Sequence, residues 1–241
     1  KVVCDPMGGG SNGGTQSGLI AELFYLDSSQ PHYNRVEDYF QHGTKSTQEL
    51  FFTDLYVPTR MFDTGFPSQT GEMIKDDQNN ELIEYFALKF RSVLKLNPTD
   101  LEGDYELALS SDDGTIMRFT DIDGEQQVVV HNDGDHPTKM GCGEVVHFDH
   151  DTTIDVQIDY YQGPRHHISL IPLWRKVDAN TRAEKECGNQ GNHRFFDPNN
   201  NSQEKQTYLD MLLRGWQPIH ASNWHLPIQE IYNPCVEGTN P

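Results

Sequence analysis

The chain has 241 residues, of which 35% are hydrophobic and 23% charged, and its formal net charge is −19 at pH 7. Its length suits one large domain or two small ones, and its apolar content is sufficient for a folded core. The acidic charge excludes nucleic acid and anionic lipid from the expected partners, because phosphate binding needs clustered Lys and Arg. No run of about 18 apolar residues is present, so neither a membrane span nor membrane insertion is predicted.

Residues 1–17 are predicted to form a flexible linker. The stretch GGGSNGGTQSG, residues 8–18, is rich in Gly and Ser, and such segments behave as random coils. A Gly/Ser tether also follows the acylated cysteine of bacterial lipoproteins. Lipid attachment at Cys4 is therefore an alternative to a disulfide, although it would leave an odd number of other thiols.

Residues 18–177 show mainly the pattern of β-strands. The alternation is clearest over residues 153–160, where Ile154, Val156, Ile158 and Tyr160 share one face. The other predicted strands span residues 85–96, 104–109, 115–120, 126–131, 144–148 and 168–174. The alternation slips near Ser92 and Val93, which indicates a bulge. Together the strands predict an all-β domain, an antiparallel β-sandwich or a barrel-like variant of it.

Residues 178–241 differ in character, being rich in Asn, Pro, Gln and aromatic residues with little periodicity. A helix is predicted over residues 203–214. Trp216 and Trp224 are interpreted as core residues rather than as sugar-stacking platforms. We expect an irregular C-terminal extension that packs on the sandwich and is held there by disulfides.

The chain has four widely separated cysteines, Cys4, Cys142, Cys187 and Cys235. None lies in the CxxC spacing of a metal site. An even, scattered set in a polar, turn-rich chain predicts two disulfides formed in an oxidising compartment. Three pairings are possible, and we expect Cys187 in one of the two bonds.

Two adjacent carboxylates, Asp112 and Asp113, occupy the turn in LALSSDDGTI, residues 107–116. Adjacent side chains of an extended trans segment point to opposite faces, so both reach one cation only where the backbone turns sharply, as at a cis peptide bond. Calcium takes about 6–8 oxygen ligands, so such a pair needs further oxygens from loops and from outside the protein. The alternative is an ordinary turn in which both side chains accept backbone N–H groups.

Three loops are predicted to meet at this end of the domain. If each connection reverses the chain direction, residues 111–113, 132–143 and 162–166 lie together. The second loop carries Asn132, Asp133 and Asp135. These residues are candidates to add ligands or to shape specificity, and the alternative is a solvated acidic loop without a binding role.

Four segments resemble the protective-antigen-type (PA-fourteen) domain family. They are GLIAELFYL at 18–26, FALKFRSVLKL at 86–96, GDYELALSSDDGTIMRFTDIDGEQQVV at 103–129, and IDVQIDYYQG with LIPLW within 154–174. The resemblance covers about 160 residues and implies a β-sandwich of the kind found in surface adhesins, glycosidase appendages, yeast flocculins and bacterial toxins. In lectin members, two adjacent Asp residues joined by a cis peptide bind calcium, and sugar hydroxyls complete the shell.

The resemblance implies specific roles for residues of this chain. Asp112 and Asp113 match the calcium-binding pair and would therefore contact both Ca²⁺ and sugar. Lectin members add an Asn side chain and a backbone carbonyl from a later loop, which here reads Gln162-Gly163-Pro164-Arg165. Gln162 and the Gly163 carbonyl are expected in those places. The residues expected to select the sugar are Arg165, His166, Asn132, Asp133 and Asp135.

The sequence thus predicts a secreted or cell-surface, calcium-dependent carbohydrate-binding adhesin domain within a larger surface protein or fibre. Its expected partner is a cell-surface glycan with vicinal hydroxyls, and binding is expected to disappear below about pH 4, where carboxylates protonate. The alternative is a non-catalytic structural or protein-binding tip domain. An enzyme is not predicted, because glycosidase carboxyl groups lie about 5–9 Å apart across the sugar and no GxSxG, HExxH or P-loop motif is present.

Overall fold

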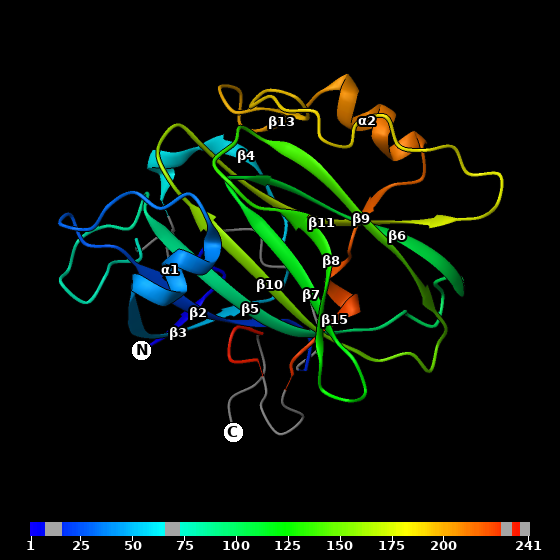
Figure 1. Ribbon diagram of the computed structural model, residues 1–241, viewed down its shortest axis with the longest axis horizontal. Helices are drawn as coiled ribbons and strands as arrows, with labels where there is room; N and C mark the ends of the chain where they lie inside the picture. Colours follow the sequence, from blue (N-terminus) through cyan, green and yellow to red (C-terminus); the bar gives the residue numbers. More distant parts are fainter. Residues whose placement is uncertain (8–15, 66–72, 228–232, 237–241) are drawn as a thin grey trace.

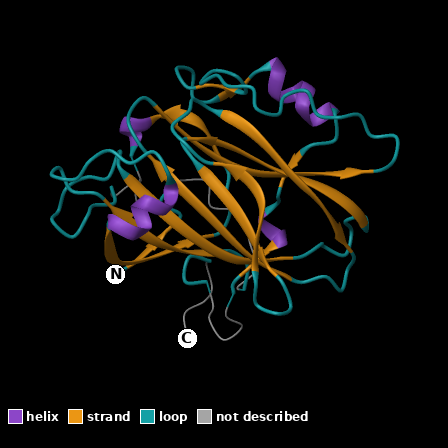
Figure 2. Ribbon diagram, viewed as in Figure 1, coloured by secondary structure: helices purple, strands orange, loops and turns teal. Residues whose placement is uncertain are grey.

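The computed structural model describes residues 1–7, 16–65, 73–227 and 233–236. Two β-sheets form the layers of a sandwich, as Figures 1 and 2 show. The first sheet contains, in spatial order, β1 (Val2–Cys4), β3 (Thr44–Phe52), β2 (Leu19–Tyr25), β5 (Phe86–Leu94), β10 (Ile154–Gln162), β7 (Thr115–Thr120) and β8 (Gln126–Asn132), with β15 (Trp224–His225) also pairing with β5. The second contains β14 (Gln217–Pro218), β11 (His167–Val177), β6 (Gly103–Asp112) and β9 (Lys139–Phe148), with β4 (Val57–Met61) also pairing with β11.

Short elements complete the chain outside the two sheets. The described helices are α1 (Val36–His42), α2 (Gln206–Leu213), and the 3-10 turns η1 (Phe62–Thr64) and η2 (Ala221–Asn223). A small separate ribbon joins β12 (Phe196–Asp197) and β13 (Gln203–Glu204). In the described ranges, no helix combines the length and apolar character needed to cross a membrane.

The alternation of apolar residues decides which face of each strand is buried. Val156, Ile158 and Tyr160 of β10 lie in the main core, and Ile154 packs against it, as predicted. Leu107 and Leu109 of β6 enter the same core from the other sheet. The predicted all-β sandwich is therefore confirmed, but the predicted bulge near Ser92 is wrong, because β5 pairs with β10 in continuous register from Leu94 to Phe86.

The strands alternate in direction while most of their connections pass between sheets. Among the strands from β6 to β11, β7 and β8 are consecutive and pair with each other as a hairpin. β6 pairs with β11 and β9, whereas β7 pairs with β10, so the Asp112-Asp113 turn joins two sheets rather than two strands of one hairpin. β9 also begins at Lys139, inside the segment predicted as a loop, because Lys139–Gly141 pair with Ser111–Leu109 of β6.

The N-terminal segment is not a linker throughout. Val2–Cys4 forms a strand parallel to β3, and Val3 and Met7 are buried in the main core. Cys4 is joined to Cys235, which favours the disulfide over lipid attachment. Residues 8–15, which carry most of the Gly/Ser stretch, lie outside the described residues.

The C-terminal extension covers the outer face of the second sheet and also extends both sheets through β14 and β15. A second apolar cluster joins Ala108, Met140, Ile171 and Leu173 of the sheet to residues of the extension, which are Phe195, Phe196, Tyr208, Met211 and Trp216. Trp224 enters the main core, so both tryptophans are buried as predicted. The predicted helix is α2, and the second disulfide joins Cys142 of β9 to Cys187.

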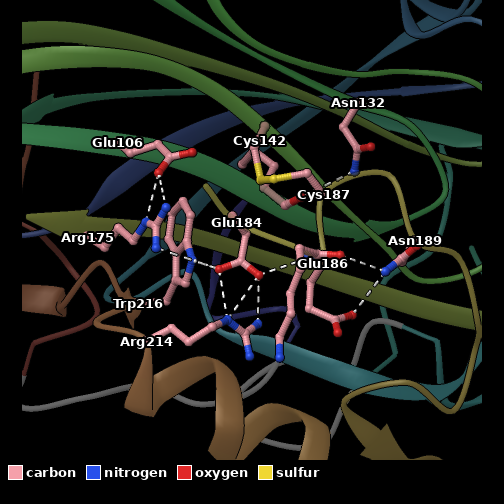
Figure 3. Close-up of a disulfide and its surroundings, with 12 residues drawn as sticks. Glu106, Asn132, Cys142, Arg175, Glu184, Glu186, Cys187, Asn189, Arg214 and Trp216 are labelled. Carbon is pink, nitrogen blue, oxygen red and sulfur yellow. Dashed lines mark hydrogen bonds and ion pairs between the residues drawn. A yellow bond between two sulfur atoms is a disulfide. The ribbon is translucent and has the colours of Figure 1, made fainter. Parts of the chain in front are cut away.

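Buried ion pairs reinforce this attachment (Figure 3). Arg175 of β11 contacts Glu106 of β6 and lies over the ring of Trp216. The fully buried Glu184 carboxylate accepts hydrogen bonds from the Arg214 guanidinium and from Nε1 of Trp216. Removing one partner from such a network leaves buried charge without compensation.

We expect Glu184→Ala to lower the free energy of unfolding by about 3–5 kcal/mol, because Arg214 and Arg175 lose a buried counter-charge. Urea unfolding monitored by tryptophan fluorescence measures the change. The matched control is Glu144→Ala on the exposed side of β9, which we expect to stay within about 0.5 kcal/mol of wild type. Equal effects of the two substitutions would show that the ionic network does not stabilise the extension.

Candidate functional site

Three loops meet at one end of the sandwich, where β6, β8 and β10 all terminate. The first begins at Asp112, the second follows Asn132 and the third follows Gln162. The Gly163 N–H donates to Asp113 Oδ2 over 2.8 Å, and the His136 N–H donates to Asp113 Oδ1 over 3.2 Å. These contacts confirm that the three loops converge, although most strands reach this end by crossing between sheets.

Asp112 and Asp113 form a buried carboxylate pair joined by a cis peptide bond. Each residue is only 4% exposed, and neither forms an ion pair with any described residue. Burial, reinforced by the neighbouring charge of Asp113, raises the pKa of Asp112 to about 9. Burial, together with the charge of Asp135, raises the pKa of Asp113 to about 7. Without a bound cation, protonation of this pair therefore begins well above pH 4. The expected loss of sugar binding below about pH 4 stays a prediction.

The two carboxylates differ in their surroundings. Asp113 accepts two backbone N–H groups, whereas Asp112 Oδ2 is buried without a hydrogen-bond partner. Gly163 makes the approach to Asp113 possible. A Cβ at that position would lie 3.2 Å from Asp113 Oδ2 and 3.1 Å from Asp135 Oδ1, which is tighter than ordinary contact.

Gln162 is buried beside the pair, and its side chain is held from both ends. Its Nε2 donates to the His167 carbonyl over 3.1 Å, and its Oε1 lies 3.0 Å from the Tyr160 hydroxyl. That hydroxyl also lies 2.8 Å from the carbonyl oxygen of Asp112, so its single proton can be donated to either acceptor. Gln162 thus connects the third loop to the cis turn, and its role as a calcium ligand stays a prediction.

Asn132 and Asp133 support the second loop from beneath. Asn132 is 1% exposed, and its Nδ2 lies within 3.0–3.3 Å of acceptors on Leu109, Ser111 and Lys139. Burial keeps this side chain from a sugar, so its assignment as a sugar contact is wrong in this structure. The half-buried Asp133 accepts the Val36 N–H at the start of α1, which places it as a helix cap.

Asp135 lies at the exposed rim together with residues that sequence reasoning missed. Its Oδ1 accepts the Tyr161 hydroxyl proton over 2.8 Å, and its Oδ2 lies 3.1 Å from Nε2 of His32. The His32 ring packs edge-on against Tyr85, with centroids 5.3 Å apart. His32 belongs to the connection between β2 and α1, and no motif in the sequence pointed from that connection to the carboxylate pair.

Arg165 and His166 of the third loop are both exposed. The Arg165 side chain is 63% exposed, lies 3.8 Å from the Glu84 carboxylate and stands over the Phe62 ring. His166 follows it through a second cis peptide bond, and its ring also faces Phe62. Their predicted place beside the pair is consistent with their position in the third loop.

The donor set at the carboxylate pair fits a hard cation. Calcium binds carboxylate, carbonyl and amide oxygens, and all three kinds occur where the loops meet. The buried Asp112 Oδ2 has no hydrogen-bond partner, so it is free to act as a ligand atom. The group of three closely spaced His, Cys, Asp or Glu side chains found among the described residues is Glu106 with Cys142 and Cys187, but those two sulfurs form a disulfide and cannot bind a metal (Figure 3).

We expect the metal-free protein to lose stability as pH rises from about 4 towards about 9. A carboxyl whose pKa is raised by folding holds its proton more tightly in the folded chain than in the unfolded chain. Its contribution to stability is therefore fully present below the pKa of the unfolded chain, and it is lost as the pH rises to the pKa of the folded chain. At pH 8, Asp112→Asn is expected to exceed wild type in free energy of unfolding by about 1–3 kcal/mol, since one pKa unit corresponds to about 1.4 kcal/mol. Urea unfolding in chelator at pH 5 to 9 measures this difference. Parallel pH profiles of the two proteins would contradict the shifted pKa.

Comparison with known proteins identifies remote structural similarity. No family model and no curated protein sequence matches the chain. A PA14 sugar-binding domain from an RTX adhesin is 18% identical, with a TM-score of 0.47, over 66% of this chain and 90% of that one. The epithelial adhesin 6 A domain from Candida glabrata, in complex with Galb1-3GlcNAc, is 15% identical, with a TM-score of 0.45, over 74% of this chain and 86% of that one. The PA14 domain of the antifreeze protein MpAFP is 11% identical, with a TM-score of 0.44, over 68% of this chain and 84% of that one.

Proposed function

We propose that this chain is a calcium-dependent carbohydrate-binding domain of the adhesin type. The observation that carries the proposal is the buried Asp112-Asp113 pair, whose Asp112 Oδ2 lacks a partner at the point where three loops meet. Two buried carboxylates repel each other, and a divalent cation removes that repulsion while replacing lost hydration. The pair is therefore better suited to an ion than to an ordinary turn.

Asp112 and Asp113 would hold the calcium ion, with Gln162 and the Gly163 carbonyl as further candidate ligands. Calcium supplies a positive centre to which hydroxyl oxygens bind. Vicinal hydroxyls of a glycan suit this role because two neighbouring oxygens reach one ion together. The exposed residues of the second and third loops, which are Asp135, Arg165 and His166, would then discriminate between sugars.

The two disulfides favour an oxidising, extracellular location for this function. The proposed partner is a glycan on a cell surface, and a larger surface protein or fibre is the proposed setting of the domain. A single weak site serves adhesion when many copies act on one surface, because effective concentration then multiplies the apparent affinity.

One observation favours a second function, that of a structural tip domain. Asp113 already accepts two backbone N–H groups, so it organises the loops without any ion. For this reason Asp112, whose Oδ2 has no such partner, is the sharper residue to substitute. The two functions differ in whether the wild-type protein binds calcium at this pair.

We expect Asp112→Asn to abolish calcium binding while leaving the fold intact, because it removes one charge without changing side-chain size. Isothermal titration with calcium at pH 8 measures the affinity, and circular dichroism measures the fold. The control is Asp121→Asn in the exposed turn after β7, where Asp121 accepts the N–H groups of Asp123 and Glu125. Calcium affinity should also weaken between pH 9 and pH 6, because protons compete for the pair. Unchanged calcium affinity in Asp112→Asn would show that calcium does not bind at this pair.

We expect sugar binding to be weak and to require calcium. Hydroxyls that replace ordered waters on an ion make a nearly balanced exchange, so one monosaccharide should bind with Kd on the order of 0.1–10 mM, where 1 mM corresponds to about −4.1 kcal/mol. A glycan array with and without chelator, followed by titration of the best sugar and its deoxy analogue, measures this. Binding that survives chelation, or an array without any calcium-dependent signal, would favour the structural domain.

A further inference from the structure

A short segment of the C-terminal extension runs beside the loop that borders the carboxylate pair. The Gly188 N–H donates to the Met140 carbonyl over 2.8 Å, and the Gly191 N–H donates to the Thr138 carbonyl over 2.9 Å. Gln190 forms a bridge with Lys139 between these two bonds. Residues 187–192 therefore extend the edge of the second sheet at the start of β9.

Two further bonds fix this segment to the loop and the strand. The Thr138 N–H donates to Asn192 Oδ1 over 3.1 Å, and Cys187 is disulfide-bonded to Cys142 at the other end (Figure 3). Thr138 is fully buried, and its hydroxyl lies 2.9 Å from that of Thr59 in β4. The segment, the loop and β4 thus form one packed unit.

The opposite side of the same loop faces the site. The His136 N–H donates to Asp113 Oδ1 over 3.2 Å. His136 is held in place through its ring, whose nitrogens lie 2.9 Å from the Pro137 carbonyl and 2.8 Å from the Asn132 carbonyl. Residues 133–138 therefore lie between the extension and the Asp113 carboxylate.

We propose that residues 187–192 position the loop 133–138 against the carboxylate pair, with Asn192 as the positioning residue and the Cys142–Cys187 disulfide as its fixed end. The inference rests on the proposed function in that the pair is taken to bind calcium. It makes the C-terminal extension a working part of the binding site in addition to a cover for the second sheet.

The first test compares the two disulfides of the same molecule. Cys142→Ser/Cys187→Ser should weaken calcium affinity about tenfold, whereas Cys4→Ser/Cys235→Ser should leave it within about twofold of wild type. The Cys4–Cys235 bond closes a separation of 231 residues against 45, so its loss should destabilise the chain more in the loop-entropy account. If Cys142–Cys187 has only a structural role, the double variant that loses more stability should also lose more calcium affinity. If the disulfide positions the loop, Cys4→Ser/Cys235→Ser should lose more stability, whereas Cys142→Ser/Cys187→Ser should lose more calcium affinity.

The second test addresses Asn192. Asn192→Ala should weaken calcium affinity about fivefold, the equivalent of one hydrogen bond, and Asn192→Asp, which keeps an acceptor oxygen, should restore it. The control is Asn189→Ala, because Asn189 Nδ2 contacts only the extension itself, at the Lys185 carbonyl and Glu186. Loss of affinity in both alanine variants would assign the effect to the extension as a whole and overturn the role of Asn192.

Amide hydrogen exchange in chelator separates this inference from the proposed function. Asn192→Ala should accelerate exchange at Thr138 and His136 while leaving the amides of β7 and β10 unchanged. Unchanged exchange at Thr138 and His136 would overturn the positioning role whatever the calcium result. A wild-type protein that binds no calcium would contradict the proposed function, and the exchange data alone would then decide whether the extension positions the loop.

Discussion

The burial of two neighbouring carboxylates without a positive partner is the constraint around which this end of the molecule is organised. Asp113 is held by the backbone of two other loops, and Asp112 retains an oxygen without a partner. A charged pair in such surroundings is costly, and the raised pKa values of both residues express that cost. Protons relieve that cost, and the proposed calcium ion would relieve it as well.

The sandwich places three loops at this pair through strands that alternate between its sheets. β6 and β10 belong to different sheets, yet both end at the site, so the pair lies at the mouth of the interface between the layers. The extension then seals the outer face of the second sheet with aromatic residues and buried ion pairs. Its segment 187–192 pairs with the start of β9 at the edge of the site, so the irregular extension is hydrogen-bonded to the regular second sheet.

Sequence patterns predicted the framework of the site and mistook several of its details. The meeting of the three loops followed from strand alternation, because direction reverses at each connection whether or not the two strands pair. The length of β9 was missed because Gly141 and Gly143 interrupt the apolar alternation on which strand prediction depends. Residues 1–7 were misjudged because the Gly/Ser stretch obscured the short strand before it, which forms only where β3 offers an edge.

By itself, the sequence determined the all-β class, the helix over α2, the two disulfides and the acidic turn, because each depends on local pattern or composition. Tertiary structure decided which polar residues lie exposed around the carboxylate pair. Asn132 became a buried support and Asp133 a helix cap, whereas His32 and Tyr85 came to the rim from the distant β2–α1 connection and from the residue before β5. It also decided the disulfide pairing. The reason is physical: side chains beyond the strand ends are oriented by neighbours far away in the chain, and no local periodicity records those neighbours.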